Sequence, residues 1–229
     1  MAARDHSRHH GVVLAPPAED LCLAFANTRY WRGRAAPAET LNGFADVLDW
    51  LAKNGGAPQG LVTQARKWAD AHHGDAGVAA AESIALREAI YRLFADIADG
   101  GKLAERDLAA LNDALAETPP RLHLSRGEHG WGWEANEAPP SVATLLAPVL
   151  WSAADLLIYS GNRRLRRCAN EECLWLFMDH SKGGTRRWCD MNSCGNRAKA
   201  KRHYLRSKGA DGGDPSRRSR RAFCCGFNR

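Results

Sequence analysis

The sequence lacks an apolar run long enough to cross a membrane. Its longest apolar stretch lies near Leu145–Leu157, and Asp155 interrupts it. A membrane-spanning helix needs about 20 apolar residues, so we expect no membrane partner. The first residues, MAARDHSRHHGVV, also contain no apolar segment of signal-peptide length, and we therefore expect a cytoplasmic protein.

The sequence also lacks the motifs that mark common enzyme classes. It contains no phosphate-binding loop, no HExxH motif, no dinucleotide-binding glycine fingerprint and no Ser-His-Asp order. The H-x-E…P-C-x-x-C pattern of zinc deaminases is absent as well. We therefore expect that the protein is not an enzyme.

Acidic residues become scarce after residue 160. Residues 1–160 carry a net charge of −6 and residues 161–229 a net charge of +12, which together give the +6 of the whole chain. Such asymmetry is expected when one part of a protein binds a polyanion. A solvated basic tail would produce the same imbalance, so charge alone does not decide between the two.

Apolar residues recur at helical spacing through the acidic part of the chain. We expect a short helix within Glu19–Thr28 and five longer ones after it. Thr40 is expected to cap the second helix, Ser83 to open the fourth, and Pro139-Pro140-Ser141 to start one long last helix. Between the fifth helix and the last one, RLHLS and WGWEA alternate around RGEHG. This alternation predicts a β-hairpin with Leu122, Leu124, Trp131 and Trp133 on one face.

Cysteine is almost absent before residue 168, where only Cys22 occurs, and is then concentrated. Four cysteines follow the pattern C-x4-C-x15-C-x4-C, and they are Cys168, Cys173, Cys189 and Cys194. Zinc prefers four ligands in a tetrahedron, and two close pairs can face one ion. We expect LWLFMDHS to form a strand, Lys182–Thr185 to turn the chain, and RRWC to form the returning strand that joins the pairs.

Two other states of these cysteines compete with zinc. Two disulfides are ill suited to a cytoplasmic protein. Free thiols would leave a module of roughly 40 residues without a metal or covalent cross-link, and a module of that size is too small to be stable alone. A site of four thiolates has no open position for water or substrate, so we expect one structural zinc ion rather than a catalytic one.

A basic helix is predicted directly after the last of the four cysteines. The run NRAKAKRHYLR contains good helix formers and neither Gly nor Pro, and Ser193 or Asn192 could cap it. Basic side chains here and just before Cys189 are expected to contact phosphates. They are Arg186, Arg187, Arg197, Lys199, Lys201, Arg202 and Arg206.

These features together predict an α+β protein. A mainly α-helical N-terminal domain with a β-hairpin is expected over residues 13–160, followed by a small zinc-binding ββα-type finger over residues 161–207. Residues 1–12 and 208–229 are expected to be disordered, the latter as a basic tail.

The second half of the cysteine pattern resembles the CGNR zinc finger family. Cys194-Gly195-Asn196-Arg197 is the motif after which that family is named, and RRWC precedes it. LCLAFANT (Leu21–Thr28), the segment from Leu111 and the helix ending in SAADLLIYS are similar to the ABATE domain that usually precedes this finger. The resemblance implies a bacterial, stress-induced transcription regulator whose finger binds DNA.

Several functions fit these observations. The leading hypothesis is a zinc-dependent DNA-binding regulator, with a homodimer through the helical domain to add specificity. An RNA-binding protein is the first alternative, because Trp175, Phe177, Trp188 and Tyr204 could stack on bases. A sensor is the second alternative. Either Trp31, Trp50 and Trp68 line a pocket for a small-molecule effector, or oxidation of the thiolates releases zinc.

Overall fold

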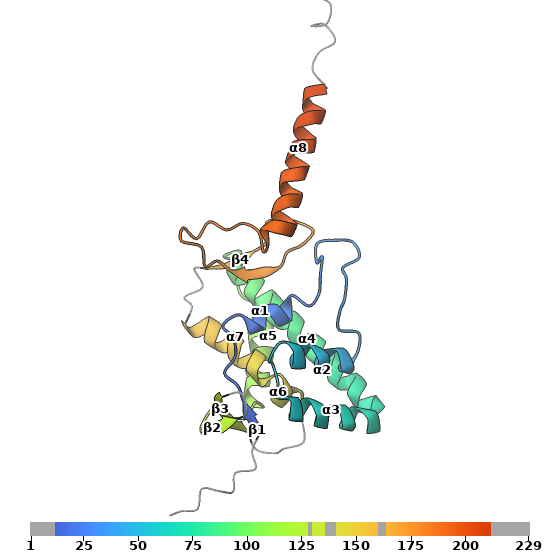
Figure 1. The fold of residues 1–229 in the computed structure, drawn as a ribbon, viewed down its shortest axis with the longest axis vertical. Coiled ribbons are helices and arrows are strands. Elements are labelled where there is room, and N and C mark those ends of the chain that lie inside the picture. The colour runs from blue at the N-terminus through green and yellow to red at the C-terminus, as the bar shows by residue number, and fades with distance from the viewer. Residues whose placement is uncertain (1–11, 128–129, 136–140, 160–163, 212–229) are drawn as a thin grey trace, which may run out of the picture. The chain divides into compact units, whose positions relative to one another are not determined.

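The computed structural model describes residues 12–127, 130–135, 141–159 and 164–211 (Figure 1). Residues 1–11 and 212–229, which form most of the two segments expected to be disordered, lie outside this range. The expected domain boundary after residue 160 also falls outside it. Contacts divide the chain into two compact units, Met1–Cys189 and Asp190–Arg229.

The body of the larger unit is a group of helices around one apolar core (Figure 1). These helices are α1 (Leu21–Ala26), α2 (Phe44–Lys53), α3 (Gln59–Ala71), α4 (His73–Ala98), α5 (Glu105–Ala116), α6 (Val142–Leu145) and α7 (Ala147–Tyr159). Helix α4 contacts α1, α2, α3 and α5, and its Ile90, Leu93 and Phe94 are completely buried. The expected mainly helical N-terminal region is therefore confirmed.

Two helices begin away from the residues expected to start them. Helix α2 begins at Phe44 because the Thr40 hydroxyl is engaged elsewhere, donating a hydrogen bond to the carbonyl of Thr28 at 2.6 Å. Helix α4 begins at His73, and Ser83 lies inside it, donating to the carbonyl of Ala79 at 2.7 Å. The alanine-rich turns before Ser83 lack an apolar stripe, but alanine is the strongest helix former.

The expected long last helix is two helices. Ser141 starts the first of them as expected, since its hydroxyl accepts a hydrogen bond from the backbone N–H of Thr144 at 3.1 Å. The helix is interrupted at Leu146, and α7 begins at Ala147. Pro148 explains the break, because in one continuous helix its ring would collide with the carbonyl of Thr144.

A three-stranded antiparallel sheet contains the expected hairpin. Strands β2 (Leu124–Gly127) and β3 (Gly130–Ala135) pair directly, and β1 (Val12–Leu14) adds to the other edge of β3 in the order β1-β3-β2. Leu14 is completely buried, whereas Leu124 and Trp131 are mainly exposed. The sheet therefore covers the core with β1 while much of the hairpin face is left in solvent.

A second, two-stranded sheet precedes the smaller unit. Strand β4 (Leu165–Arg167) pairs antiparallel with β5 (Leu176–Met178), and all three residues of β5 are buried. Both strands contact α4, and β5 also contacts α1. The partner of β5 is thus the segment before Cys168. The expectation that RRWC would form the returning strand is wrong, because no strand is present there.

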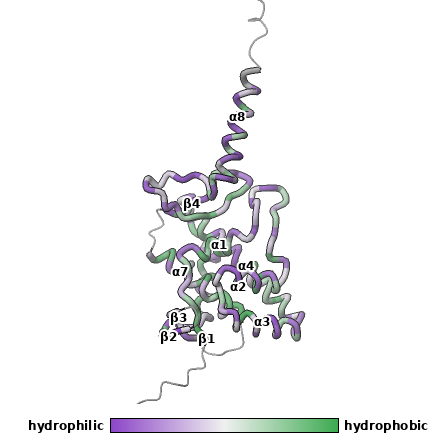
Figure 2. Tube along the Cα trace, in the orientation of Figure 1, coloured by the Kyte–Doolittle hydropathy of each residue, from purple (hydrophilic) through white to green (hydrophobic). Residues whose placement is uncertain are grey.

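The described part of the smaller unit is helical. A π-helical turn, η1 (Met191–Gly195), leads directly into α8 (Asn196–Asp211). The cap is Asp190, whose carboxylate accepts a hydrogen bond from the backbone N–H of Ser193 at 2.7 Å, so neither Ser193 nor Asn192 caps this helix. Most of α8 is hydrophilic (Figure 2). Among the described residues, no helix is both long and apolar enough to cross a membrane.

Candidate metal centre

The first cysteine pair lies on a tight knuckle between β4 and β5. The backbone N–H of Cys168 donates to the carbonyl of Trp175 at 2.8 Å, and the N–H of Cys173 donates to the carbonyl of Asn170, also at 2.8 Å. Leu174 then adopts a left-handed conformation with φ of 58°. The four intervening residues thus form one closed turn that directs both thiols to the same side.

The second pair comes from two different local structures. Cys189 is the last residue of an irregular segment. A hydrogen bond from the N–H of Ala169 to the carbonyl of Arg187, at 2.9 Å, holds this segment against the knuckle. Cys194 lies in the η1 turn and is buried. Ala169 belongs to the first pair's turn, so one backbone contact sets the position of Cys189 relative to Cys168.

The four thiols lie together, with their sulfur atoms within 4.8 Å of one another. The sulfurs of Cys173 and Cys189 are 3.7 Å apart, and none of the four cysteines forms a disulfide. Sulfurs bound to one zinc ion at about 2.3 Å in a tetrahedron are about 3.8 Å apart, whereas a disulfide requires about 2.05 Å. The arrangement fits a zinc site and not a pair of disulfides.

Proton sharing within the cluster also favours a cation. Hydrogen bonds from the thiols of Cys173 and Cys189 lower the pKa of Cys168 far below its usual value. The hydrogen bond to Cys168 raises the pKa of Cys173, and hydrogen bonds to Cys168 and Cys173 raise that of Cys189. Thiolates this close repel one another, and a bound cation would offset that repulsion.

Asp179, which no sequence pattern indicated, organises the segment that returns to Cys189. This residue follows β5 directly and is completely buried. Its carboxylate accepts from the hydroxyl and the N–H of Ser181, at 2.6 and 2.9 Å, and from the N–H of Arg186 at 2.9 Å. The hydroxyl hydrogen bond from Ser181 is the main reason that the pKa of Asp179 is lowered. The N–H of Arg186 is therefore bonded to this carboxylate and is not available for pairing with a neighbouring strand.

Asn27 joins the helical body to the free edge of β5. Its side-chain amide donates to the carbonyl of Leu176 at 2.8 Å and accepts from the N–H of the same residue at 3.0 Å. Asn27 is buried at the end of α1, so this amide takes the place of a third strand. A polar residue directly after an apolar helix was the only sequence signal for it.

The cysteine knuckle also touches the helical body. The hydroxyl of Tyr91, on α4, donates to the carbonyl of Leu174 at 2.9 Å. The N–H of Gly33 donates to the carbonyl of Glu172 at 3.2 Å, and a Cβ at Gly33 would lie 1.7 Å from the carbonyl oxygen of Glu171. Only glycine permits this approach, so the loop after α1 fits closely against the knuckle.

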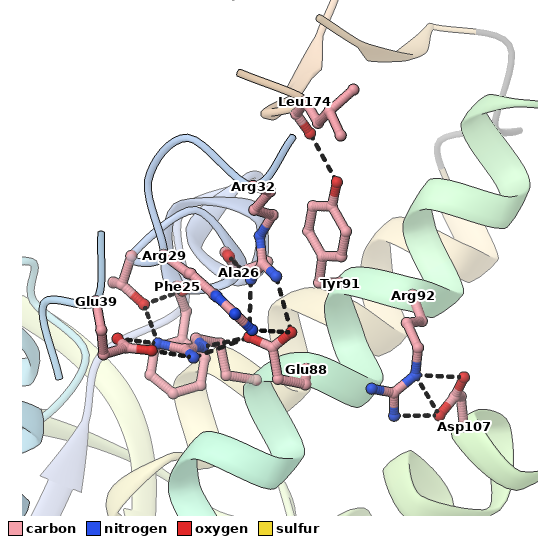
Figure 3. A network of polar contacts seen from close by, with 12 residues as sticks. Phe25, Ala26, Arg29, Arg32, Glu39, Glu88, Tyr91, Arg92, Asp107 and Leu174 are labelled. Carbon is pink, nitrogen blue, oxygen red and sulfur yellow. Dashed lines mark hydrogen bonds and ion pairs between the residues drawn. The ribbon is translucent and has the colours of Figure 1, made fainter. Parts of the chain in front are cut away.

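A buried ion-pair network fixes that loop to α4 (Figure 3). Arg87 is completely buried, and its guanidinium binds both carboxylate oxygens of Glu39 at 2.6 and 2.7 Å. Arg32 binds Glu88 in the same bidentate way at 2.7 and 2.9 Å and lies 3.7 Å from the ring of Tyr91. Burial raises the pKa of Glu88, but hydrogen bonds and charges of Arg32 and Arg87 outweigh burial and lower it.

The seven basic residues expected to bind nucleic acid fall into two groups. Arg186 and Arg187 lie before Cys189 and are exposed, and the side chain of Arg186 also makes local contacts. The Arg186 guanidinium donates to the carbonyls of Trp188 and Cys189 and lies 4.6 Å from the ring of Phe177. The remaining five are exposed on α8, and they are Arg197, Lys199, Lys201, Arg202 and Arg206.

The four-cysteine ββα module that follows the helical body places this protein in the class of zinc-finger proteins. Comparison with protein-family models gives the particular family. Residues 19–159 match the ABATE model, described as a putative stress-induced transcription regulator, and residues 164–207 match the CGNR zinc finger. The chain therefore belongs to the ABATE family and carries a CGNR zinc finger. No curated protein matches the sequence.

The family match and the geometry together assign the metal. A CGNR zinc finger with four clustered thiols holds one structural zinc ion, whose ligands are the cysteines of the x4-spaced pairs. When bound, the ion neutralises the thiolates and links two local structures that are each only a few residues long. The fold class and the cofactor expected from the sequence are thus confirmed.

Proposed function

We propose that the protein is a transcription regulator whose zinc-stabilised finger binds DNA. One observation carries this proposal: the basic helix α8 begins directly after the η1 turn that contains the zinc ligand Cys194. Metal binding fixes that turn and therefore the first residues of α8. The helix then presents its charges from a defined starting point rather than from a flexible tail.

The charge on α8 supports a polyanionic partner. No acidic residue occurs between Asn196 and Ala210, and the one carboxylate within α8 is that of Asp211, its last residue, at i+3 from Lys208. Tyr204 and Leu205 are also exposed, which leaves α8 without a buried apolar face among its described residues. Nucleic-acid phosphates would relieve the repulsion between its basic side chains and release counterions.

The aromatic residues favour duplex DNA over single-stranded RNA. Phe177 is buried, Trp175 packs against Tyr30 with ring centroids 4.9 Å apart, and Trp188 lies beneath the guanidinium of Arg187. These rings are therefore not arranged as an open platform for stacked bases. Tyr204 is the exception, being 55% exposed.

Fluorescence anisotropy with labelled nucleic acids tests the proposal. The zinc-loaded chain should bind duplex DNA more tightly than single-stranded RNA, with affinity that falls steeply as salt rises. Replacing Lys199 and Lys201 by Gln should weaken binding and reduce the salt slope, whereas Lys102→Gln, between α4 and α5, should change neither. Salt-independent binding, or equal effects of both sets of variants, would contradict the proposal. Tighter binding of the RNA would instead favour an RNA-binding protein.

We also propose that the protein acts in the cytoplasm, without catalytic activity, as a homodimer formed through the helical domain. The mainly exposed side chains of Leu124 and Trp131 on the hairpin support a second protein surface there. A dimer would bring two basic helices to one DNA site and so increase specificity. Sedimentation velocity should show a dimer that Trp131→Ser dissociates. A monomer at all concentrations would contradict this part.

A further inference from the structure

A cavity of about 620 Å³ lies within the larger unit, where α1 and α2 face β5 and the segment that follows it. Its walls come from the helical body on one side and from the first part of the zinc finger on the other, including Cys189. Small-molecule sites in proteins commonly have volumes of about 300–1,000 Å³. The cavity is therefore large enough for a small ligand, and the proposed binding of nucleic acid does not account for its presence.

Four of the residues that line the cavity are Tyr, Trp or Phe. Tyr30 and Trp175 line it together, and Trp50 lines it from α2 with its ring packed on Phe25, the centroids 5.0 Å apart. Ala24 lies beside them on α1 and is exposed, so no side chain larger than a methyl group occupies that part of the wall. Of the three tryptophans that the sequence suggests for a pocket, only Trp50 is among the described lining residues.

The charge of the lining is negative. Three carboxylates, those of Asp20, Asp46 and Asp49, line the cavity together with Arg186, whose guanidinium is engaged with two backbone carbonyls. Asp49 forms an ion pair with Arg66.

The other two carboxylates retain capacity to bind a cation. One oxygen of Asp46 accepts from the N–H of Asn42 at 2.7 Å, and within the described residues Asp20 forms no side-chain hydrogen bond or ion pair. With Arg186 and Arg66 counted against the three carboxylates, a net charge of −1 remains at the cavity.

We propose that this cavity binds an organic cation with a flat aromatic body. Aromatic faces attract cations, and carboxylates at the rim would fix an ammonium group, while the apolar surface of the cavity takes up the ring. An anionic ligand of the same shape would meet repulsion from Asp20 and Asp46. Binding here does not depend on the proposed contact with DNA, although the occupant would touch both the helical body and the finger.

Three compounds with one indole ring and different charge test the proposal on the zinc-loaded full chain. Tryptamine is a cation, tryptophol is neutral and indole-3-acetate is an anion at neutral pH. By isothermal titration calorimetry, tryptamine should bind about tenfold more tightly than tryptophol, as expected for a charge contact added to an aromatic site. Indole-3-acetate should bind more weakly than either.

Two variants locate the site. Ala24→Phe places a ring in the cavity and should abolish tryptamine binding, whereas Ala109→Phe, at an exposed alanine on α5, should leave it unchanged. Asp20→Asn should reduce the preference for tryptamine over tryptophol, and Asp113→Asn should not. The zinc content and melting temperature of each variant confirm that it is folded.

The outcomes separate this proposal from the nucleic-acid one. Absence of tryptamine binding, equal affinity for all three compounds, or binding that survives Ala24→Phe would overturn the cavity assignment. None of these results would affect DNA affinity measured by anisotropy. Conversely, a chain that binds tryptamine in the expected order but not DNA would retain the cavity and lose the regulator function.

Discussion

The side-chain amide of Asn27 pairs with both backbone groups of Leu176, at 2.8 and 3.0 Å. Asn27 ends α1 in the ABATE domain, and Leu176 begins β5 in the CGNR finger. The two family segments are thus joined by a contact that imitates strand pairing. Together with the contacts of α4 with β4 and β5, it belongs to the compact larger unit that continues past the ABATE domain to Cys189.

Replacing Asn27 should destabilise the larger unit. Asn27→Ala leaves the N–H and carbonyl of Leu176 buried without partners, which should lower the free energy of unfolding by about 1–3 kcal/mol. Urea denaturation followed by tryptophan fluorescence measures this loss. Asn112→Ala, on the exposed side of α5, serves as the control and should change stability by less than about 0.5 kcal/mol. Equal stability of the two variants would show that the pairing contributes nothing.

Asp179→Asn should weaken zinc binding. The neutral amide cannot accept hydrogen bonds from both the Ser181 and the Arg186 sides, so the segment before Cys189 loses its support. Supporting groups around metal ligands typically contribute about 10–100-fold to affinity, and a chelator competition assay should show a loss in this range. Asp113→Asn is the matched control. Unaltered zinc affinity in Asp179→Asn would show that the returning segment holds its position without this carboxylate.

The same carboxylate predicts a dependence of stability on pH. Because the pKa of Asp179 is lower in the folded protein than in the unfolded chain, its stabilising effect is complete above the unfolded value of about 3.9. This contribution disappears as pH falls through the lower, folded value. Urea midpoints measured between neutral and acidic pH should therefore fall more steeply in the wild type than in Asp179→Asn. Parallel curves would contradict the shift.

Loss of one ligand should remove the metal. The wild-type chain should contain about one zinc per molecule by elemental analysis, and Cys189→Ser should contain much less, because a structural site requires all four thiolates. Cys22→Ala is the control, since Cys22 is a buried core residue whose pKa burial raises to about 12. This control should keep its zinc. A zinc content that is unchanged in Cys189→Ser would show that another ligand completes the site.

Arg87 should be among the most sensitive positions in the helical body. Arg87→Ala leaves Glu39 without its arginine partner and removes one of the two arginines that bind Glu88. Breaking a buried ion pair costs about 3–5 kcal/mol. Arg66→Ala breaks the exposed pair with Asp49 and should cost at most about 1 kcal/mol. Thermal unfolding of both variants compares the two pairs. Similar losses would mean that the partly exposed carboxylates of Glu39 and Glu88 are solvated well enough to offset the loss of Arg87.

Local patterns predicted the features that local forces create. The apolar stripes identified the helices, because amphipathic periodicity directly reflects the side that packs against the core. The spacing of the cysteines identified the metal ligands, because the knuckle that holds Cys168 and Cys173 closes within a few residues. These features need no knowledge of distant contacts, although the starts of α2 and α4 and the break at Leu146 differ from the expectation.

Long-range polar contacts account for most of what the sequence did not reveal. Strand β1 is only three residues long, and its partner β3 lies more than a hundred residues away, so its short apolar run carried little signal. Thr40 failed to cap α2 because Thr28 binds its hydroxyl. Asn27 and Asp179 act through partners that only the tertiary fold brings near, and a single sequence does not indicate such pairs.

The two hydrogen bonds that the Arg186 guanidinium donates have a consequence for which mutations the protein tolerates. Its planar guanidinium serves two carbonyls and covers the ring of Phe177, which a lysine ammonium group cannot reproduce. A charge-conserving change to lysine at this position therefore removes a structural group, whereas the same exchange at Arg202 or Arg206 on α8 alters only a surface cation. Mutational tolerance will thus differ between arginines that lie close together in the sequence.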